Sequence, residues 1–152
     1  MEALHSRIRL RWVLSRLVLA AVVGGVVAVA LARLGRPPLV GAALGAAILL
    51  LGVAHALLLY RSWGFALDAD ALELERGVLT QVETAVPFVR IQHVDTQRGP
   101  VDRLLGLSSV VVYTAGSRGA DVTIPGLAPD RARDLRNRLR DLAIESEPED
   151  AV

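Results

Sequence analysis

Two long stretches without a charged side chain constrain the fold of this chain more than any other feature. Residues 17–32 and 39–60 contain no Asp, Glu, Lys or Arg. At 1.5 Å per residue the second stretch covers about 33 Å as a helix, enough for the roughly 30 Å hydrocarbon core of a bilayer. The first covers about 24 Å, but apolar residues from Trp12 extend it, and Arg16 can direct its guanidinium to the headgroups. The sequence therefore predicts two transmembrane helices, at 12–33 and 39–60.

The short segment between the two predicted helices favours a tight hairpin. Pro37 and Pro38 cannot continue a helix, and Gly35 tolerates a left-handed turn. Small residues recur at four-residue spacing in both helices, which lets helix backbones approach closely in a membrane. An alanine-rich composition also produces this spacing by chance, so packing through these positions is one of two interpretations. The glycines concerned are Gly24 in the first helix and Gly41 and Gly45 in the second.

The arginines that flank the hairpin predict its orientation. Arg7, Arg9, Arg11 and Arg16 precede the first uncharged stretch, Arg61 follows the second, and only Arg33 and Arg36 lie between them. Because positive charge favours the cytoplasmic side, both termini are expected in the cytoplasm, as in a multi-pass protein of the cytoplasmic membrane. Four residues are expected to anchor the helix ends at the membrane surface, namely Trp12, Arg16, Tyr60 and Trp63.

A secretory signal peptide is the alternative interpretation of the first stretch. A basic start and an apolar run precede Ala30-Leu31-Ala32, which resembles a cleavage site. A second complete span only six residues later argues against secretion. The hairpin interpretation is therefore preferred, with residues 1–11 as a basic cytoplasmic N-terminus.

Charge is segregated along the chain. The first 62 residues hold seven Arg and one acid, a net charge of +6, whereas the remaining 90 hold ten Arg and fifteen acids, a net charge of −5. The overall +1 therefore gives no support to nucleic-acid binding. The chain has no Cys and no Lys, which excludes disulfides, thiolate chemistry, lysine Schiff bases and a P-loop lysine.

After residue 63 the periodicity changes from helical to that of β-strands. Apolar and charged residues alternate at 72–75, Gly77 supplies a turn, and alternation resumes from Val78 to Val86. Residues 91–97 form the next predicted strand, and the β-branched run at 108–114 suits a strand buried on both faces. Alternation at 120–124, after a loop at 115–119, predicts a last strand.

Two helical pieces complete the predicted domain. Pro100 to Leu105 forms a short helix that Gly106 ends in a left-handed cap. A second, amphipathic helix runs from Pro129 to about Ile144. Five to seven short antiparallel strands closed by this helix predict a mainly-β domain over 63–144, a bent sheet or open barrel. The acidic tail 145–152 is expected to be disordered.

Several motifs follow one another in the β-rich part. They are Leu72 with Gly77, Val86-Pro87, Arg90-Ile91-Gln92, Gln97-Arg98-Gly99-Pro100, Arg103-Leu104-Leu105-Gly106-Leu107, Thr114-Ala115-Gly116 and Ile124-Pro125-Gly126-Leu127. In this order, behind two spans, the chain from Phe65 to about Leu139 resembles the bacterial pleckstrin-homology-like (PH-like) domain of membrane-flanked proteins, the YdbS-like family.

This resemblance implies a small integral membrane protein with a cytoplasmic PH-like module, often accompanied by a larger relative that carries several copies of the domain. It implies no catalytic residue. Many relatives carry basic residues after the position of Gly77, where this chain has Thr80, Gln81, Val82 and Glu83. That departure argues against binding of anionic lipid by this strand.

Candidate chemistry is sparse. His5, His55 and His93 lack metal-ligand spacing, so no metal is expected, and the absence of nucleotide-binding motifs predicts no cofactor. His55, near the end of the second span, is expected to be a neutral imidazole bonded to a neighbouring backbone or headgroup rather than a functional group. His93 and Asp95 share a strand face, either as half of a catalytic relay or, preferably, as a solvated polar face.

Three arginines form a candidate interaction rim. Arg90, Arg98 and Arg103 lie at strand ends and in the short helix, where they could bind phosphate or carboxylate. The alternative is pairing with acids of the same domain.

We therefore expect a non-enzymatic membrane protein that contacts the lipid bilayer and presents its domain to a protein partner or to a second copy. An enzyme or transporter is disfavoured because two spans enclose no pathway and carry no carboxylate. The alternative function is an anionic lipid-binding module at the inner leaflet, which the net charge of −5 opposes.

Overall fold

A computed structural model describes residues 1–116 and 121–146, and the chain divides into two compact units. Residues 9–61 form a helical unit, and residues 1–8 join the chain from Ser62 onward in a β-rich unit. The loop expected at 115–119 and the tail expected at 145–152 lie largely outside the described residues. Glu145 itself ends the last helix.

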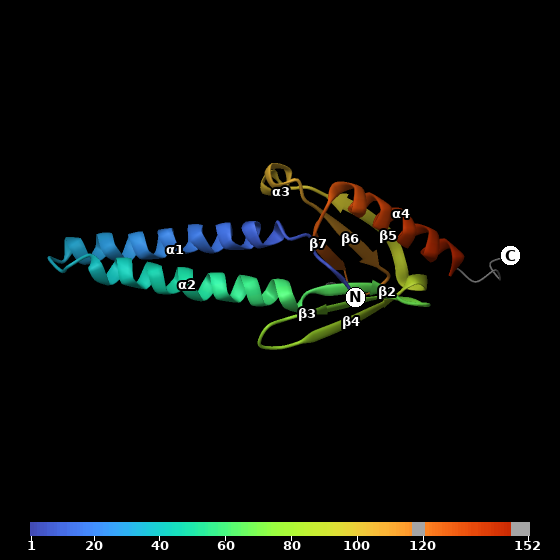
Figure 1. The fold of residues 1–152 in the computed structure, drawn as a ribbon, viewed down its shortest axis with the longest axis horizontal. Helices are drawn as coiled ribbons and strands as arrows, with labels where there is room; N and C mark the ends of the chain where they lie inside the picture. The colour runs from blue at the N-terminus through green and yellow to red at the C-terminus, as the bar shows by residue number, and fades with distance from the viewer. Residues whose placement is uncertain (117–120, 147–152) are drawn as a thin grey trace. The chain divides into compact units, whose positions relative to one another are not determined.

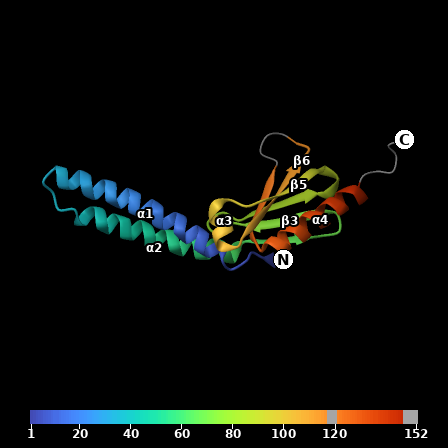
Figure 2. The same ribbon diagram turned by 90° about the horizontal axis from the view of Figure 1, so that it is seen from above.

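The helical unit is an antiparallel pair, with α1 (Ile8–Arg33) and α2 (Leu39–Ser62) side by side (Figures 1 and 2). Both helices are long and apolar enough to cross a membrane. Only 11% and 6% of their most apolar 18-residue windows are buried, whereas a core helix of a soluble protein is mostly buried. The turn between them contains Gly35 at φ +68°. Length, composition and exposure therefore agree with the predicted hairpin.

The two helices approach most closely at glycines. A Cβ atom added to Gly41 would lie 2.4 Å from the backbone nitrogen of Ala28, and one added to Gly24 would lie 2.9 Å from the Cα atom of Gly45. On Gly45, a Cβ atom would lie 3.2 Å from the carbonyl oxygen of Ala20. The structure thus brings Gly24, Gly41 and Gly45 together at the helix contact. Gly25 faces open space.

The β-rich unit contains, within the described residues, two antiparallel sheets (Figure 1). The first has the order β1-β2-β3-β4 and the second the order β5-β6-β7. The first sheet consists of β1 (Glu2–Ala3), β2 (Gly64–Leu67), β3 (Ala71–Arg76) and β4 (Val82–Pro87). The second consists of β5 (Ile91–Gln97), β6 (Ser108–Thr114) and β7 (Val122–Leu127). The helical pieces are the 3-10 turn η1 (Phe88–Arg90), α3 (Pro100–Leu105) and α4 (Pro129–Glu145).

The core of this unit joins both sheets and α4, which packs on β5, β6 and η1. All residues of β6 from Ser108 to Val112 are buried, as expected for a strand covered on both faces. Burying so many apolar side chains is the main stabilising contribution to the domain. The largest fully buried side chains in this unit are Ile8, Phe65, Leu72, Leu74, Phe88, Leu107, Val110, Val112, Ile124, Leu127, Leu135 and Leu139. The expected mainly-β domain with a C-terminal helix is confirmed.

The first eight residues belong to this domain. β1 pairs with β2, and the His5 backbone N–H donates to the Gly126 carbonyl at 2.7 Å. Leu4 and Ile8 are 3% and 0% exposed. Gly126 has φ +65°, and a Cβ atom there would lie 2.7 Å from the Ile8 Cβ atom. The domain is therefore larger than the expected 63–144, and the start of the chain is not a separate basic segment.

One strand is shorter than its sequence pattern suggested. The alternation from Val78 predicted a strand to Val86, but β4 begins only at Val82. Gly77 has φ +124°, and a Cβ atom there would lie 1.9 Å from the Thr80 carbonyl oxygen. The chain therefore doubles back over several residues after β3, and an alternating composition cannot reveal such a close backbone approach.

The glycine contact predicts a position-specific response to larger side chains. Gly41→Leu should lower the free energy of unfolding of the purified protein in micelles by about 1–3 kcal/mol, because the backbone of Ala28 leaves no room for a side chain. Denaturation in mixed micelles, followed by circular dichroism, measures this change.

Gly25→Leu is the matched control, since it adds the same side chain to a glycine without neighbours within 4 Å. It should leave stability unchanged or raise it slightly, because a helical glycine is entropically unfavourable. Equal destabilisation by both substitutions would contradict the close contact at Gly41.

Candidate functional site

The edge of β4 borders a groove between the two sheets. Among the described strands β4 pairs only with β3, so its other side lacks a neighbouring strand. A cavity of about 340 Å³ lies beside it, within the roughly 300–1,000 Å³ range of small-ligand pockets. Among the described residues its lining is mostly small or apolar, and Arg90 is the one charged member. The lining residues are Thr84, Ala85, Val86, Pro87, Arg90, Thr114, Ala115, Gly116 and Val122.

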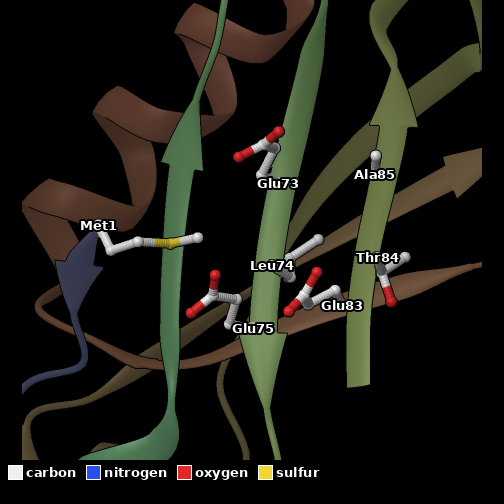
Figure 3. A pocket seen from close by; sticks show the side chains of 7 residues that line it. All are labelled: Met1, Glu73, Leu74, Glu75, Glu83, Thr84 and Ala85. Carbon is white, nitrogen blue, oxygen red and sulfur yellow. The ribbon is translucent and has the colours of Figure 1, made fainter. Parts of the chain in front are cut away.

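One face of the first sheet is acidic. Glu75 and Glu83 are directly opposite each other on β3 and β4, and Glu73 lies two residues from Glu75 on the same face. Figure 3 shows these carboxylates around a cavity of about 170 Å³, with the Met1 side chain reaching across β2 toward them. Like charges in direct cross-strand pairs destabilise a sheet. This face therefore repels anionic groups and suits a basic one.

The three arginines of the expected rim do not lie together. Arg90 ends η1 and Arg98 follows β5, so the length of β5 separates them by roughly 25 Å. Arg103 lies on α3 near the Arg98 end. All three are exposed, but a single phosphate or carboxylate cannot contact Arg90 and the other two at once.

Arg98 and the buried Asp102 have structural roles around α3. The Arg98 Nε atom donates to the Leu107 carbonyl at 3.0 Å, and the Gly99 backbone N–H donates to an Asp102 carboxylate oxygen at 3.2 Å. Asp102 is only 4% exposed. These bonds hold the two ends of the segment that contains α3. Arg98 therefore contacts a backbone carbonyl, whereas an acidic side chain was the expected partner. The sequence signal for this helix start is Gly99-Pro100 followed by Asp102, which lies three residues after Gly99.

His93 and Asp95 lie on an exposed face of β5. The His93 ring stacks on Tyr113, with centroids 4.1 Å apart and an interplanar angle of 17°. No group of three or more His, Asp or Glu residues within the described residues could hold a metal ion. The neighbourhood of His93 is therefore an aromatic contact between adjacent strands.

The four expected membrane anchors differ in their surroundings. Trp12 and Arg16 are half-buried in α1, and the Arg16 methylenes lie against Gly52, where a Cβ atom would approach the Arg16 Cβ atom to 2.9 Å. The Tyr60 ring is covered by Arg9, whose guanidinium carbon lies 4.8 Å from the ring centroid. Trp63 is only 7% exposed, so its indole has little surface to offer to headgroups.

His55 has one buried ring nitrogen. Its Nδ1 atom is buried and has no hydrogen-bond partner in the described part of the chain. The neutral imidazole was expected to bond a nearby backbone group or headgroup. A bond from this imidazole to a backbone group or headgroup, through either ring nitrogen, stays a prediction.

An ion pair ties the N-terminal strand to α4. The Arg131 Nε atom donates to the Glu2 Oε1 atom at 2.7 Å, and its Nη2 atom donates to Oε2, which makes the pair bidentate. This hydrogen bonding lowers the pKa of Glu2, against partial burial that raises it. The same contact raises the pKa of Arg131. Glu2 and Arg131 are so far apart in the chain that no local sequence pattern pairs them.

The comparison with protein families agrees with this architecture. Residues 14–143 match the model of the bacterial PH domain, which is most of the chain. The chain belongs to the bacterial PH domain family. It is 30% identical over 84 residues to transmembrane protein YdbS of Bacillus subtilis (strain 168), a match that covers 55% of this chain.

The chain matches about half the length of YdbS, 51% of that protein. No solved structure matches. The expected YdbS-like resemblance is confirmed, and the protein is a membrane-associated member of the bacterial PH domain family. This family is not an enzyme family. The family match begins at residue 14, so the strand β1 and the buried Leu4 and Ile8 lie outside it.

The Glu2–Arg131 pair predicts a pH-dependent contribution to the stability of this bacterial PH domain. The pKa of Glu2 in the folded state is lowered from its ordinary value of 4.5. The pair therefore contributes its full stability above pH 4.5, and this contribution is lost as the pH falls through the lowered pKa. Both side chains are about 40% exposed, so Glu2→Gln should cost only about 0.5–1 kcal/mol at pH 7.

Thermal unfolding of the full chain and of the Glu2→Gln variant between pH 7 and pH 3 measures this contribution. The difference in Tm between the two proteins should shrink toward pH 3. Glu83→Gln, which removes a carboxylate from the like-charged pair, is the control and should not lower Tm at pH 7. A Glu2→Gln difference that persists unchanged at pH 3 would contradict the assignment.

Proposed function

We propose that this protein is a non-enzymatic membrane anchor whose bacterial PH domain binds an extended protein segment along β4. The observation that carries the proposal is the edge of β4 that pairs with no described strand, beside the 340 Å³ groove. An exposed strand edge presents N–H and C=O groups that an added strand can satisfy. The small residues Ala85, Ala115 and Gly116 leave room for the side chains of that strand.

Charge helps to define the partner segment. Arg90 at the groove favours an acidic side chain of the partner at that end. Glu83 on β4 favours a basic side chain directly beside it on the added strand, because it already faces Glu75. A segment with an acidic and a basic residue at opposite ends would satisfy both groups. A larger relative with several copies of the domain, or a second copy of this chain, is the partner class that the family resemblance suggests.

An anionic lipid module is the second candidate function. The acidic face formed by Glu73, Glu75 and Glu83 opposes it, as does the net charge of −5 after residue 62. We therefore rank protein binding by the domain above lipid binding by the domain.

We further propose that both helices span the cytoplasmic membrane and that both termini lie in the cytoplasm. The positive-inside rule supports this orientation, because five arginines flank the outer ends of the hairpin and two flank its loop. The domain and the N-terminal strand then face the cytoplasm together, as their shared compact unit requires.

Cysteine labelling tests the orientation without any background substitution, because the chain contains no Cys. Leu34→Cys, at a loop residue that is 75% exposed, should react with a membrane-impermeant maleimide in intact cells. Ser146→Cys, at the exposed end of α4, should react only after the cells are permeabilised. The reverse pattern would contradict the proposed orientation.

Site-specific photocrosslinking tests the groove. A photoreactive residue at Ala85 should crosslink in native membranes to one segment of a protein partner or of a second copy. A second substitution, Arg90→Glu, should reduce the crosslinking yield about tenfold, because it removes a charge-assisted contact.

Arg103→Glu is the matched control, since it makes the same charge change at an exposed residue of α3 and should leave the yield unchanged. Crosslinks from position 85 only to lipid, or equal losses with both arginine substitutions, would contradict a protein partner in the groove.

A further inference from the structure

A cavity of about 490 Å³ lies within the helical unit, near the C-terminal end of α2. Five of its lining residues come from the last three turns of that helix, and Arg9 comes from the start of α1. The lining residues are Arg9, Ala54, Leu57, Leu58, Tyr60 and Arg61. All of them belong to the same compact unit.

The lining divides into an apolar part and a cationic part. Leu57 and Leu58 are 42% and 50% exposed and continue the uncharged surface of α2. Arg61 is the first charged residue after twenty-two uncharged ones, and it is exposed. A membrane-spanning helix changes from apolar to charged at the level of the lipid headgroups. The cavity therefore joins hydrocarbon and headgroup chemistry.

The contact between Arg9 and Tyr60 orients the cationic part. The Arg9 guanidinium carbon lies 4.8 Å from the centroid of the Tyr60 ring. A guanidinium carries five N–H donors in one plane, so one that stacks on a ring can donate to phosphate oxygens beside its other partners. Arg61 lines the same cavity, so two guanidinium groups can share one phosphate.

We propose that this cavity binds an anionic phospholipid, with the phosphate held by Arg9 and Arg61 and an acyl chain lying along Leu57 and Leu58. A lipid fits better than a soluble phosphate compound because only the lipid has an acyl chain that can bury the apolar lining. The two positive charges favour a headgroup with net negative charge over a zwitterionic one. This site is separate from the domain, whose acidic face opposes anionic lipid.

Lipid retention by the full chain tests the proposal. The protein, purified in a neutral detergent, is mixed with phosphatidylglycerol or phosphatidylcholine, and bound lipid is counted by native mass spectrometry. The wild type should retain phosphatidylglycerol in preference to phosphatidylcholine. The double variant Arg9→Gln/Arg61→Gln should bind phosphatidylglycerol about tenfold or more weakly.

The matched control is Arg33→Gln/Arg36→Gln, which removes the same charge at the other end of the hairpin and should retain the lipid. Leu58→Trp keeps both arginines and should weaken lipid binding by filling the apolar part of the cavity. This variant tests the proposal even if the double variant fails to fold. Equal retention of phosphatidylglycerol and phosphatidylcholine, equal losses in both double variants, or displacement by soluble glycerol phosphate would overturn the proposal.

Discussion

The packing of the N-terminal segment against the β-rich domain, through the buried Leu4 and Ile8, is the constraint on which the rest of the structure depends. Ile8 is fully buried at the point where α1 begins, and it packs on Gly126 at the end of β7. Chain continuity then ties both ends of the helical hairpin to the domain, at residues 8 and 62. A fragment that starts after the hairpin lacks β1, Leu4 and Ile8, so it exposes apolar surface that the complete chain buries.

The two units are stabilised by different forces. In the domain, apolar side chains leave water, and the buried Asp102 is tolerated because it accepts a hydrogen bond from the Gly99 backbone. Between membrane helices no such gain exists, because lipid is as apolar as leucine, and close backbone contact at Gly41 and Gly24 takes its place.

Charge divides the surface into regions with different partners. The carboxylates on β3 and β4 disfavour anionic ligands at the first sheet, whereas Arg90 brings a positive charge to the groove beside β4. The arginines at the open end of the hairpin form a third region, next to apolar surface. Protein binding by the domain and lipid binding by the hairpin are therefore compatible, since they use different residues with opposite electrostatic preferences.

The sequence by itself determined the features that depend on neighbouring residues. The two apolar helices follow from length and composition, α3 follows from Pro100 and Gly106, and the buried β6 follows from its β-branched run. Tertiary structure alone decided which distant residues meet. It paired Glu2 with Arg131 and buried Trp63. Hydropathy and turn propensity are properties of a short segment, whereas the pairing of sheets and the packing of a terminal segment depend on contacts between residues far apart in the chain.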